Sequence, residues 1–234
     1  MKILAIDSTA ITASCAVTED EKLLAQSFVN VGLTHSQTLL PLIDDTLRNA
    51  KVKIESIDRF VVCAGPGSFT GVRIGVSTVK GLAFTKNVEC VGVSTLDAIA
   101  CSSGVFSGVI CAVMDARCNQ VYNALFRAAN GKTERLCPDR ALSIDELTEE
   151  LKEYNEDILL AGDGAELCFN KMNGTIPVTL APQNVRFQSG FGAAIASLRD
   201  EYADKCVKPN DLTPIYLRLP QAERELNQRL AQQK

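Results

Sequence analysis

The sequence is poor in histidine, and this scarcity excludes several kinds of catalytic site. Among 234 residues there is a single histidine, His35. Zinc sites of the H-E-x-x-H type need two histidines, as do most zinc sites with mixed cysteine and histidine ligands, so neither kind is predicted. A serine–histidine–aspartate triad would have to be built on His35. We expect this residue instead to donate or accept one hydrogen bond at the start of a helix.

Cysteine pairs, long apolar runs and excess positive charge are also missing. The nine cysteines form no C-x-x-C motif, which indicates free thiols in a reducing compartment rather than a disulfide scaffold. The first apolar run, residues 3–6, is too short for a signal peptide, and no run approaches the length of a membrane helix. The net charge of −4 argues against a chain that binds nucleic acid on its own. These features predict a soluble cytoplasmic protein with no membrane contact.

What the sequence does contain is a pattern of strands and helices that occurs twice. Each pass opens with an apolar strand that ends in aspartate, at Asp7 and at Asp115. The first pass predicts strands at 2–7, 14–18, 23–30, 59–64 and 88–91, and helices at 34–50, 71–85 and after Ser94. The second predicts strands at 109–115, 120–127, 132–136, 157–161 and near Pro177, and helices at 143–154, after Gly164 and at 189–202. The Gly/Ser-rich stretch 102–108 predicts the boundary between the passes.

This order predicts an α/β protein built from a duplicated ribonuclease-H-like fold, with two lobes of mixed sheet flanked by helices. We expect an N-terminal lobe at 1–103 that carries the partner interface, a C-terminal lobe at 104–219, and a helical tail at 220–234. Actin, sugar kinases and Hsp70 ATPase domains share this arrangement and hold a nucleotide between the lobes. Such an analogy of fold does not establish a function.

The densest cluster of candidate site residues is the segment GPGSFTGVRIG, residues 65–75. Its four glycines allow close backbone approach, and the helix that follows offers free N–H groups to an anion. The spacing matches neither G-x-G-x-x-G nor the P-loop motif. Two interpretations remain, and the spacing favours the second. The loop is either an anion site, or a tight turn at Gly65 and Gly67 followed by Gly71 and Gly75, which let another helix approach closely.

Six segments together resemble the TsaB (YeaZ) family. They are the glycine loop, ILAIDST (3–9), THSQTLLP (34–41), MDARCNQVY (114–122), AGDGA (161–165) and PIYLR (214–218). The resemblance spans essentially the whole chain in the same order. It implies an actin-like (ASKHA) fold and an accessory role in the bacterial synthesis of threonylcarbamoyladenosine in tRNA. It also implies partnership with TsaD, the catalytic metallo-ATPase paralogue, and with TsaE, a small ATPase.

The sequence departs from the catalytic relatives in two places. The catalytic sibling holds its metal with two histidines four residues apart, whereas His35 is followed four residues later by Leu39. Nucleotide-binding members of the fold carry D-x-G after the first strand, but neither Asp7 nor Asp115 is followed by that glycine. We therefore expect no catalytic residue, no metal and no cofactor in this chain, with ATP and metal bound by the partner subunits.

The resemblance implies an interface formed by helices of the first lobe, in a homodimer of the isolated chain or in a heterodimer with TsaD. The interface candidates are Thr34, His35, Leu39, Leu42, Gly71, Ile74, Gly75 and Thr78. The candidates for binding an anion or nucleotide are Asp7, Ser8, Thr9, Gly65, Gly67, Ser68, Thr70, Arg73, Asp115, Arg117, Gly162, Asp163 and Gly164. Asp7 and Asp115 are expected to cap turns rather than to hold magnesium. The charge of Arg73 opposes the helix dipole, which leaves two interpretations open: a nearby carboxylate or anion, or a solvated side chain with no such partner.

We expect a non-catalytic scaffold that activates TsaD, recruits TsaE through the pair, and contacts tRNA mainly through the complex. The alternative is an enzyme of the actin-like fold, a phosphotransferase or hydrolase that holds magnesium-ATP between the lobes. In the tail, Ala222, Leu226 and Leu230 recur at a spacing of four residues, which predicts a helix with one apolar face.

Overall fold

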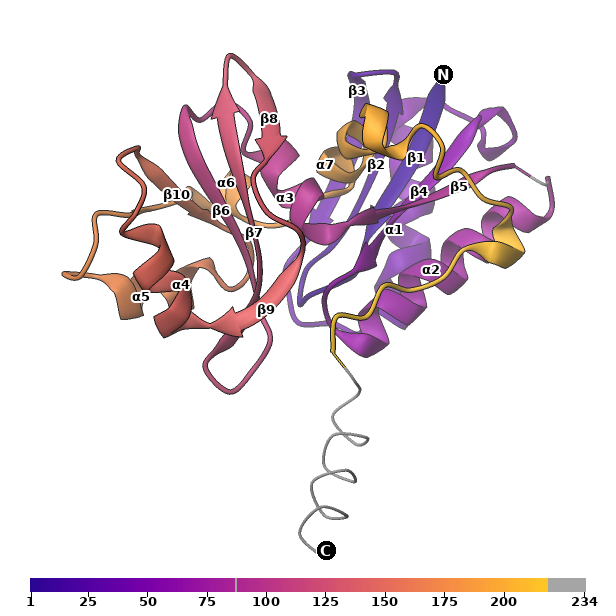
Figure 1. Ribbon diagram of the computed structural model, residues 1–234. Helices are drawn as coiled ribbons and strands as arrows, with labels where there is room; N and C mark the ends of the chain where they lie inside the picture. Colours follow the sequence, from indigo (N-terminus) through magenta and orange to yellow (C-terminus); the bar gives the residue numbers. More distant parts are fainter. Residues whose placement is uncertain (87, 219–234) are drawn as a thin grey trace, which may run out of the picture.

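The first lobe is built on a mixed five-stranded sheet in the order β3-β2-β1-β4-β5 (Figure 1). The computed structural model describes residues 1–86 and 88–218. The strands of this sheet are β1 (Lys2–Asp7), β2 (Ala13–Glu19), β3 (Lys22–Val29), β4 (Arg59–Gly65) and β5 (Cys90–Ser94). The first three form an antiparallel meander, and β4 and β5 continue it in parallel.

The second sheet repeats this plan. Its path is β11-β10-β6-β7-β8, and β9 pairs with β7. The strands are β6 (Gly108–Asp115), β7 (Gln120–Ala129), β8 (Lys132–Arg135), β9 (Arg140–Ser143), β10 (Ile158–Ala161) and β11 (Thr179–Leu180). The central strand β6 pairs antiparallel with β7 and parallel with β10, as β1 does with β2 and β4. The predicted duplication of a ribonuclease-H-like fold is therefore confirmed.

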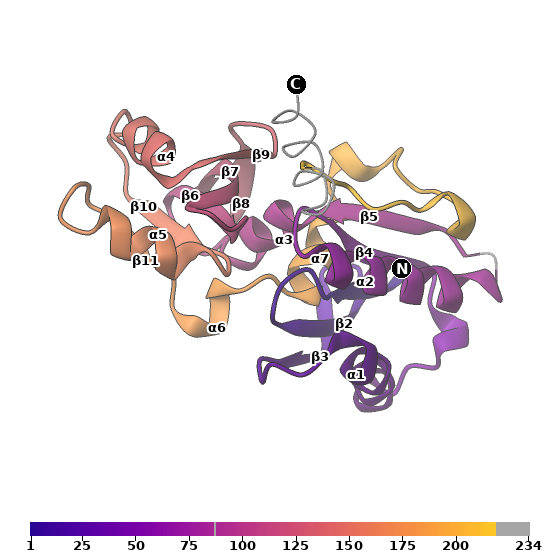
Figure 2. The ribbon, with the colours of Figure 1, turned by 90° about the horizontal axis from the view of Figure 1, so that it is seen from below.

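Helices cover both faces of the first sheet because successive side chains of a strand point to opposite sides. In β1, Leu4 and Ile6 pack with α1 (His35–Ala50) and α2 (Phe69–Phe84). Ile3 and Ala5 point the other way, towards α7 (Gly190–Ala196). Figure 2 shows α3 (Thr95–Ser102) between the two lobes. Its Ala98 joins the core of the first sheet, while Leu96 and Ile99 join that of the second.

The outer face of the second sheet is covered by α4 (Ile144–Leu151) and α5 (Ala165–Met172). Ser143 and Glu146 form a complete capping box at the start of α4, as their spacing predicts. The similar spacing at Thr34 forms none, because its side chain makes no capping hydrogen bond. The short elements are α6 (Gln183–Arg186) and the 3-10 turns at Ile54–Ser56, Asp200–Tyr202 and Pro209–Asp211.

The chain returns to the first sheet after residue 189, although its order in the sequence placed this segment with the second lobe. The predicted helix at 189–202 ends at Ala196, and α7 packs against β1 and β2. Glycine makes this approach close. A Cβ atom on Gly190 would lie 2.7 Å from the oxygen of Ala5, and Gly190 N donates to Ser14 Oγ at 2.7 Å. The lobe boundary at residue 103 stays a prediction, and the predicted tail helix lies outside the described residues.

Several element boundaries also differ from the prediction; for example, α2 begins at Phe69 and β5 at Cys90, and strand β9 was not predicted. No helix in the described ranges combines the length and the apolar character that crossing a membrane requires.

Candidate functional site

Asp7 ends the central strand of the first sheet and is fully buried. Its Oδ1 accepts hydrogen bonds from Thr9 Oγ1 at 2.7 Å and from Thr9 N at 3.3 Å. Its Oδ2 makes no standard hydrogen bond to the described residues. Burial raises the pKa of Asp7 from 3.8 to about 6, and the hydrogen bonds from Thr9 offset only part of that shift. The buried carboxyl of Asp7 thus holds the turn after β1 through its hydrogen bonds with Thr9.

The glycine loop packs directly on this turn. A Cβ atom on Gly71 would lie 2.0 Å from the oxygen of Ser8, and one on Gly67 would lie 2.4 Å from the oxygen of Thr9. At Gly75 the Cβ would lie 2.6 Å from Ser8 Oγ. We expected Gly71 and Gly75 to admit another helix; the structure shows that they admit the chain's own turn. Their role in a partner interface stays a prediction, and a bulky residue at Gly75 would disturb the first lobe itself.

The other candidates in the loop lie at the end of β4 and at the start of α2. Gly65 has a φ of +126°, and a Cβ there would meet the oxygen of Ile215 at 2.2 Å. Ser68 caps α2 by accepting from Gly71 N at 3.4 Å, and its own N–H donates to the oxygen of Thr9 at 2.7 Å. These hydrogen bonds fix the start of α2 in place. Its first residues, Phe69 and Thr70, face the space between the lobes.

A cleft of about 820 Å³ lies between the lobes. The anion candidates that line it are Thr9, Gly67, Ser68, Thr70, Arg73, Asp115, Arg117 and Asp163. The remaining candidates Asp7, Ser8, Gly65, Gly162 and Gly164 lie outside its lining. Phe69, Tyr122 and Phe187 add aromatic surface that the sequence patterns did not single out.

The turn after β6 forms the second wall of the cleft. Asp115 Oδ1 accepts a hydrogen bond from Arg117 N at 2.7 Å, which is a turn-capping arrangement. Arg117 is largely exposed, with its Nη1 3.9 Å from Asp115 Oδ2. Burial and the neighbouring Asp115 raise the pKa of Asp163 from 3.8 to about 7. Across residues 1–86 and 88–218, no three histidine, cysteine or acidic side chains are grouped as a metal site.

Arg73 contacts aromatic side chains in the part of the chain that the structure describes, and its place as an anion candidate stays a prediction. Its Nε donates to Tyr216 Oη at 2.8 Å, and its guanidinium lies 5.8 Å from the ring centre of Phe69 and 5.7 Å from that of Tyr216. The two rings stack with centroids 4.5 Å apart. Local sequence gives no signal for this contact, because Tyr216 lies 143 residues from Arg73.

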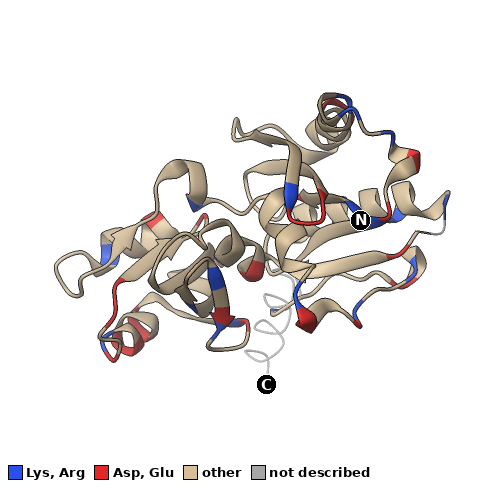
Figure 3. Ribbon diagram, turned by 90° about the horizontal axis from the view of Figure 1, so that it is seen from above, with Lys and Arg blue, Asp and Glu red and all other residues tan. Residues whose placement is uncertain are grey.

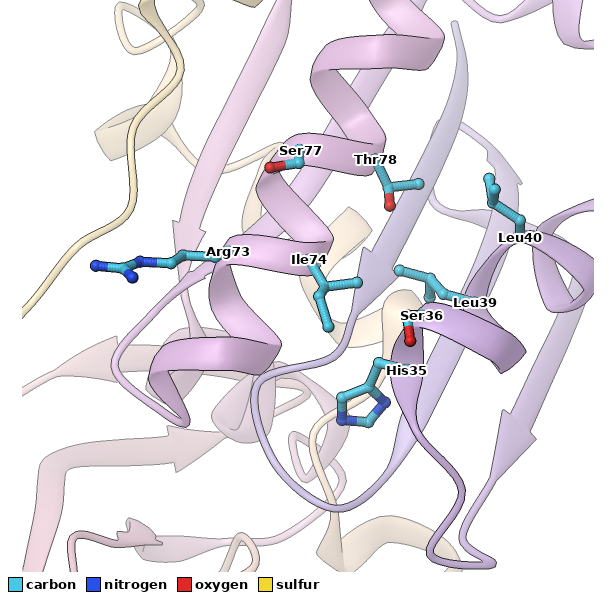
Figure 4. Close-up of a pocket in the computed structure, with 8 residues that line it drawn as sticks. All are labelled: His35, Ser36, Leu39, Leu40, Arg73, Ile74, Ser77 and Thr78. Carbon is cyan, nitrogen blue, oxygen red and sulfur yellow. The ribbon is translucent and has the colours of Figure 1, made fainter.

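A second hollow, of about 360 Å³, lies between α1 and α2 (Figure 4). We call it the α1–α2 groove; it is lined by His35, Ser36, Leu39, Leu40, Arg73, Ile74, Ser77 and Thr78. His35 Nε2 donates to the oxygen of Ala10 at 2.6 Å, since a carbonyl can only accept. In Figure 4 the guanidinium of Arg73 points away from the groove.

The groove includes four of the interface candidates, namely His35, Leu39, Ile74 and Thr78. Thr34, Leu42, Gly71 and Gly75 lie outside its lining. Leu39 is buried, at 1% exposed, whereas its neighbour Leu40 is 56% exposed and was not among the interface candidates. Leu40 is thus a surface residue that the sequence pattern missed.

Comparison with known proteins agrees with this arrangement. A family model described as TsaD, tRNA N6-adenosine threonylcarbamoyltransferase, matches residues 30–224. The tRNA threonylcarbamoyladenosine biosynthesis protein TsaB of Bacillus subtilis is 31% identical over 228 residues, which cover 95% of this chain and 96% of that protein. The chain belongs to the TsaB (YeaZ) family.

Two more relatives of the family support the assignment. TsaB of Escherichia coli is 37% identical over 134 residues, or 56% of this chain and 58% of that protein. The solved structure of YeaZ from Pseudomonas aeruginosa superposes with a TM-score of 0.78 at 24% identity, covering 92% of this chain and 99% of that one. The structural likeness shows the shared two-lobed fold. The predicted family and fold class are both confirmed.

Proposed function

We propose that this chain is a non-catalytic scaffold in the biosynthesis of threonylcarbamoyladenosine in tRNA. Membership of the TsaB family supports a role in this pathway. The finer proposal is that the chain binds TsaD and, with it, recruits TsaE. The observation that carries it is the α1–α2 groove, an apolar hollow on the surface of the first lobe.

The groove has the features of a helix-binding surface. Leu40 on its α1 side is 56% exposed, and Ile74 on its α2 side is partly exposed. Val31 and Leu33, just before α1, are 67% and 57% exposed. Exposed apolar side chains beside a helix pair favour a partner that packs apolar helix faces against them. TsaD covers this surface in the complex, and a second copy of the chain covers it in a homodimer.

The filled corner beside β1 supports the non-catalytic part of the proposal. Gly67 and Gly71 place the backbone of the loop and of α2 against Thr9 and Ser8. The space beside this turn is therefore filled by the chain's own backbone. We propose that the chain holds no cofactor, and that the partner subunits supply ATP and metal. Lys and Arg are spread over both lobes (Figure 3), which supports contact with cytoplasmic tRNA through the complex rather than through this chain alone.

The test is a pair of matched surface substitutions. Leu40→Glu places a charge in the groove, and Val105→Glu places one at a side chain that is 93% exposed, in the segment that joins the lobes. We expect Leu40→Glu to weaken binding of purified TsaD at least about tenfold, because it buries an unpaired carboxylate in the interface. Val105→Glu should bind as the unaltered chain does. Circular dichroism checks that both variants are folded.

Equal TsaD affinity of the folded Leu40→Glu and Val105→Glu variants would show that the groove is not the TsaD surface. A separate titration of the purified chain with magnesium-ATP tests the non-catalytic role. Micromolar binding accompanied by turnover would replace the scaffold with the enzyme that holds magnesium-ATP between its lobes.

A further inference from the structure

Asp97 lies in the first turn of α3, between the two lobes, and is 1% exposed. Its Oδ2 lies 2.7 Å from Arg135 Nη2, and its Oδ1 lies 3.0 Å from Arg199 Nη1. The hydroxyl of Tyr202 donates to Oδ2 at 2.6 Å. Arg135 ends β8 of the second sheet, whereas Arg199 and Tyr202 follow α7, which packs on the first sheet. One buried carboxylate therefore joins both lobes.

A second carboxylate, Asp139, extends the contact. It accepts hydrogen bonds from Arg135 Nη1 and from Ser94 Oγ, each at 2.6 Å. Ser94 is the last residue of β5 in the first sheet, and Asp139 follows β8 in the second. Burial alone would lower the pKa of Arg135, but the carboxylates of Asp97 and Asp139 raise it above its usual value. Arg135 is thus charged and has acidic partners on two sides.

The remaining groups of the cluster also bridge the sheets. Arg199 Nη2 donates to the oxygen of Thr133 on β8 at 3.0 Å and hydrogen-bonds its hydroxyl. Tyr202, 4% exposed, accepts a hydrogen bond from Ser94 N at 3.0 Å. Glu201, 39% exposed at the edge, lies 3.4 Å from Arg199 Nη1. Asp97 is buried, whereas the side chains of Arg135, Asp139 and Arg199 are partly buried; the two carboxylates and the two guanidiniums balance in charge.

Such a cluster resists a change in the angle between the lobes. A rotation that moves β8 away from α3 and α7 would separate Arg135 from Asp97, and Thr133 from Arg199. Breaking a buried, hydrogen-bonded ion pair leaves charges without partners in a poorly polar environment, which is strongly unfavourable.

We propose that Asp97, Arg135, Asp139, Arg199 and Tyr202 form an interlobe clamp that holds the two lobes at one angle and keeps the cleft at a fixed width. This goes beyond the proposed scaffold role and does not depend on it. A partner that contacts both lobes then meets a preformed surface and loses less conformational entropy on binding.

A change in the angle between the lobes changes the distance between two spin labels, one on each lobe of the full-length chain. The experiment measures the distribution of that distance. Both labelled positions are exposed. Position 21 lies in the turn between β2 and β3 of the first lobe, and position 155 lies between α4 and β10 of the second lobe. The labels are attached through unnatural amino acids so that the native cysteines stay unlabelled. We expect one narrow distance distribution for the unaltered chain. In Asp97→Asn the distribution should become at least about twofold wider, because Arg135 and Arg199 lose their shared charge.

Glu156→Gln is the matched control. It removes a carboxylate from an exposed ion pair with Arg127, 2.8 Å long, that lies within the second lobe. The distribution should not change. If Asp97→Asn does not fold, Tyr202→Phe is judged by the same criterion, since it removes two hydrogen bonds, to Asp97 and from Ser94 N, and no charge. A folded variant with the unaltered narrow distribution, or a broad distribution in the unaltered chain, would overturn the clamp.

Discussion

The turns that follow β1 and β6 occupy equivalent places in the two lobes, yet one is buried and the other is open. Asp7 is fully buried, whereas the side chain of Asp115 is 33% exposed in the cleft. Both carboxylates accept a hydrogen bond from the backbone N–H two residues later, at 3.3 Å from Thr9 and 2.7 Å from Arg117. The local turn chemistry is therefore shared, and the difference comes from what packs over each turn.

What packs over each turn depends on where the glycine-containing segment contacts the central strand of its sheet. In the first lobe, Gly71 lies over Ser8, beyond the end of β1, so the turn becomes part of the core. In the second lobe, Gly162 would place a Cβ atom 1.9 Å from the oxygen of Val113, which is still inside β6. Beyond Asp115, Ala116 is buried, but residues 117–119 are exposed. The same topology therefore buries the carboxyl of Asp7 in the first lobe and places that of Asp115 in the wall of the cleft in the second.

The largest expected effect comes from forcing the covered turn apart. Gly71→Ala would place its Cβ 2.0 Å from the backbone oxygen of Ser8, so the start of α2 or the turn has to move. We expect the free energy of unfolding to fall by about 3 kcal/mol. Gly81→Ala is the control in the same helix, because a Cβ there meets nothing within 4 Å. It should raise stability by about 0.5–1 kcal/mol. Urea denaturation measures both, and equal stability of the two variants would contradict the close packing.

A somewhat smaller effect is expected from removing the buried charge of Asp7. Its pKa is about 6 in the folded chain against 3.8 as the ordinary value, so the folded state favours the protonated form. This favourable contribution is complete below about pH 4 and is lost as the pH rises through 6. Asp7→Asn should therefore be more stable than the unaltered chain by about 2–3 kcal/mol at pH 8. The gain should vanish near pH 4.

Denaturation of Asp7→Asn and of the unaltered chain at pH 4, 6 and 8 tests this sign. A gain for Asp7→Asn that is independent of pH would mean that charge burial is not its cause.

Much of the fold was predictable because periodicity and order along the chain carry it. The strand that ends in Asp7 and the one that ends in Asp115 both read as apolar runs, and the two sheets repeat the predicted order. The capping box at Ser143 was also predictable, since it depends on residues three apart. Contacts between distant segments were not. Nothing near Gly190 in the sequence indicates that α7 packs on β1 and β2.

The candidate site was predictable as a set of turns but not in its orientation. The spacing located the glycine loop, yet which way Gly71 and Gly75 face depends on how α2 crosses the turn after β1. The sequence alone does not separate buried Leu39 from exposed Leu40, because a small rotation of a helix on a sheet shifts the edge of its buried face by one residue. Tyr216 is absent from any local pattern around Arg73, since the contact forms only when the chain folds back.

The smallest expected effect concerns the charge on the open turn. Asp115 is the second largest cause, after burial, of the raised pKa of Asp163, which is about 7. Asp115→Asn should therefore lower the pKa of Asp163, while burial keeps it above 3.8. Carbon-13 NMR titration of the aspartate side chains measures this shift. The same titration follows Asp7, whose raised pKa comes chiefly from burial and whose charge is a smaller cause of the raised pKa of Asp163. A pKa of Asp163 that does not fall in Asp115→Asn would mean that the charge of Asp115 is not a cause of its raised value.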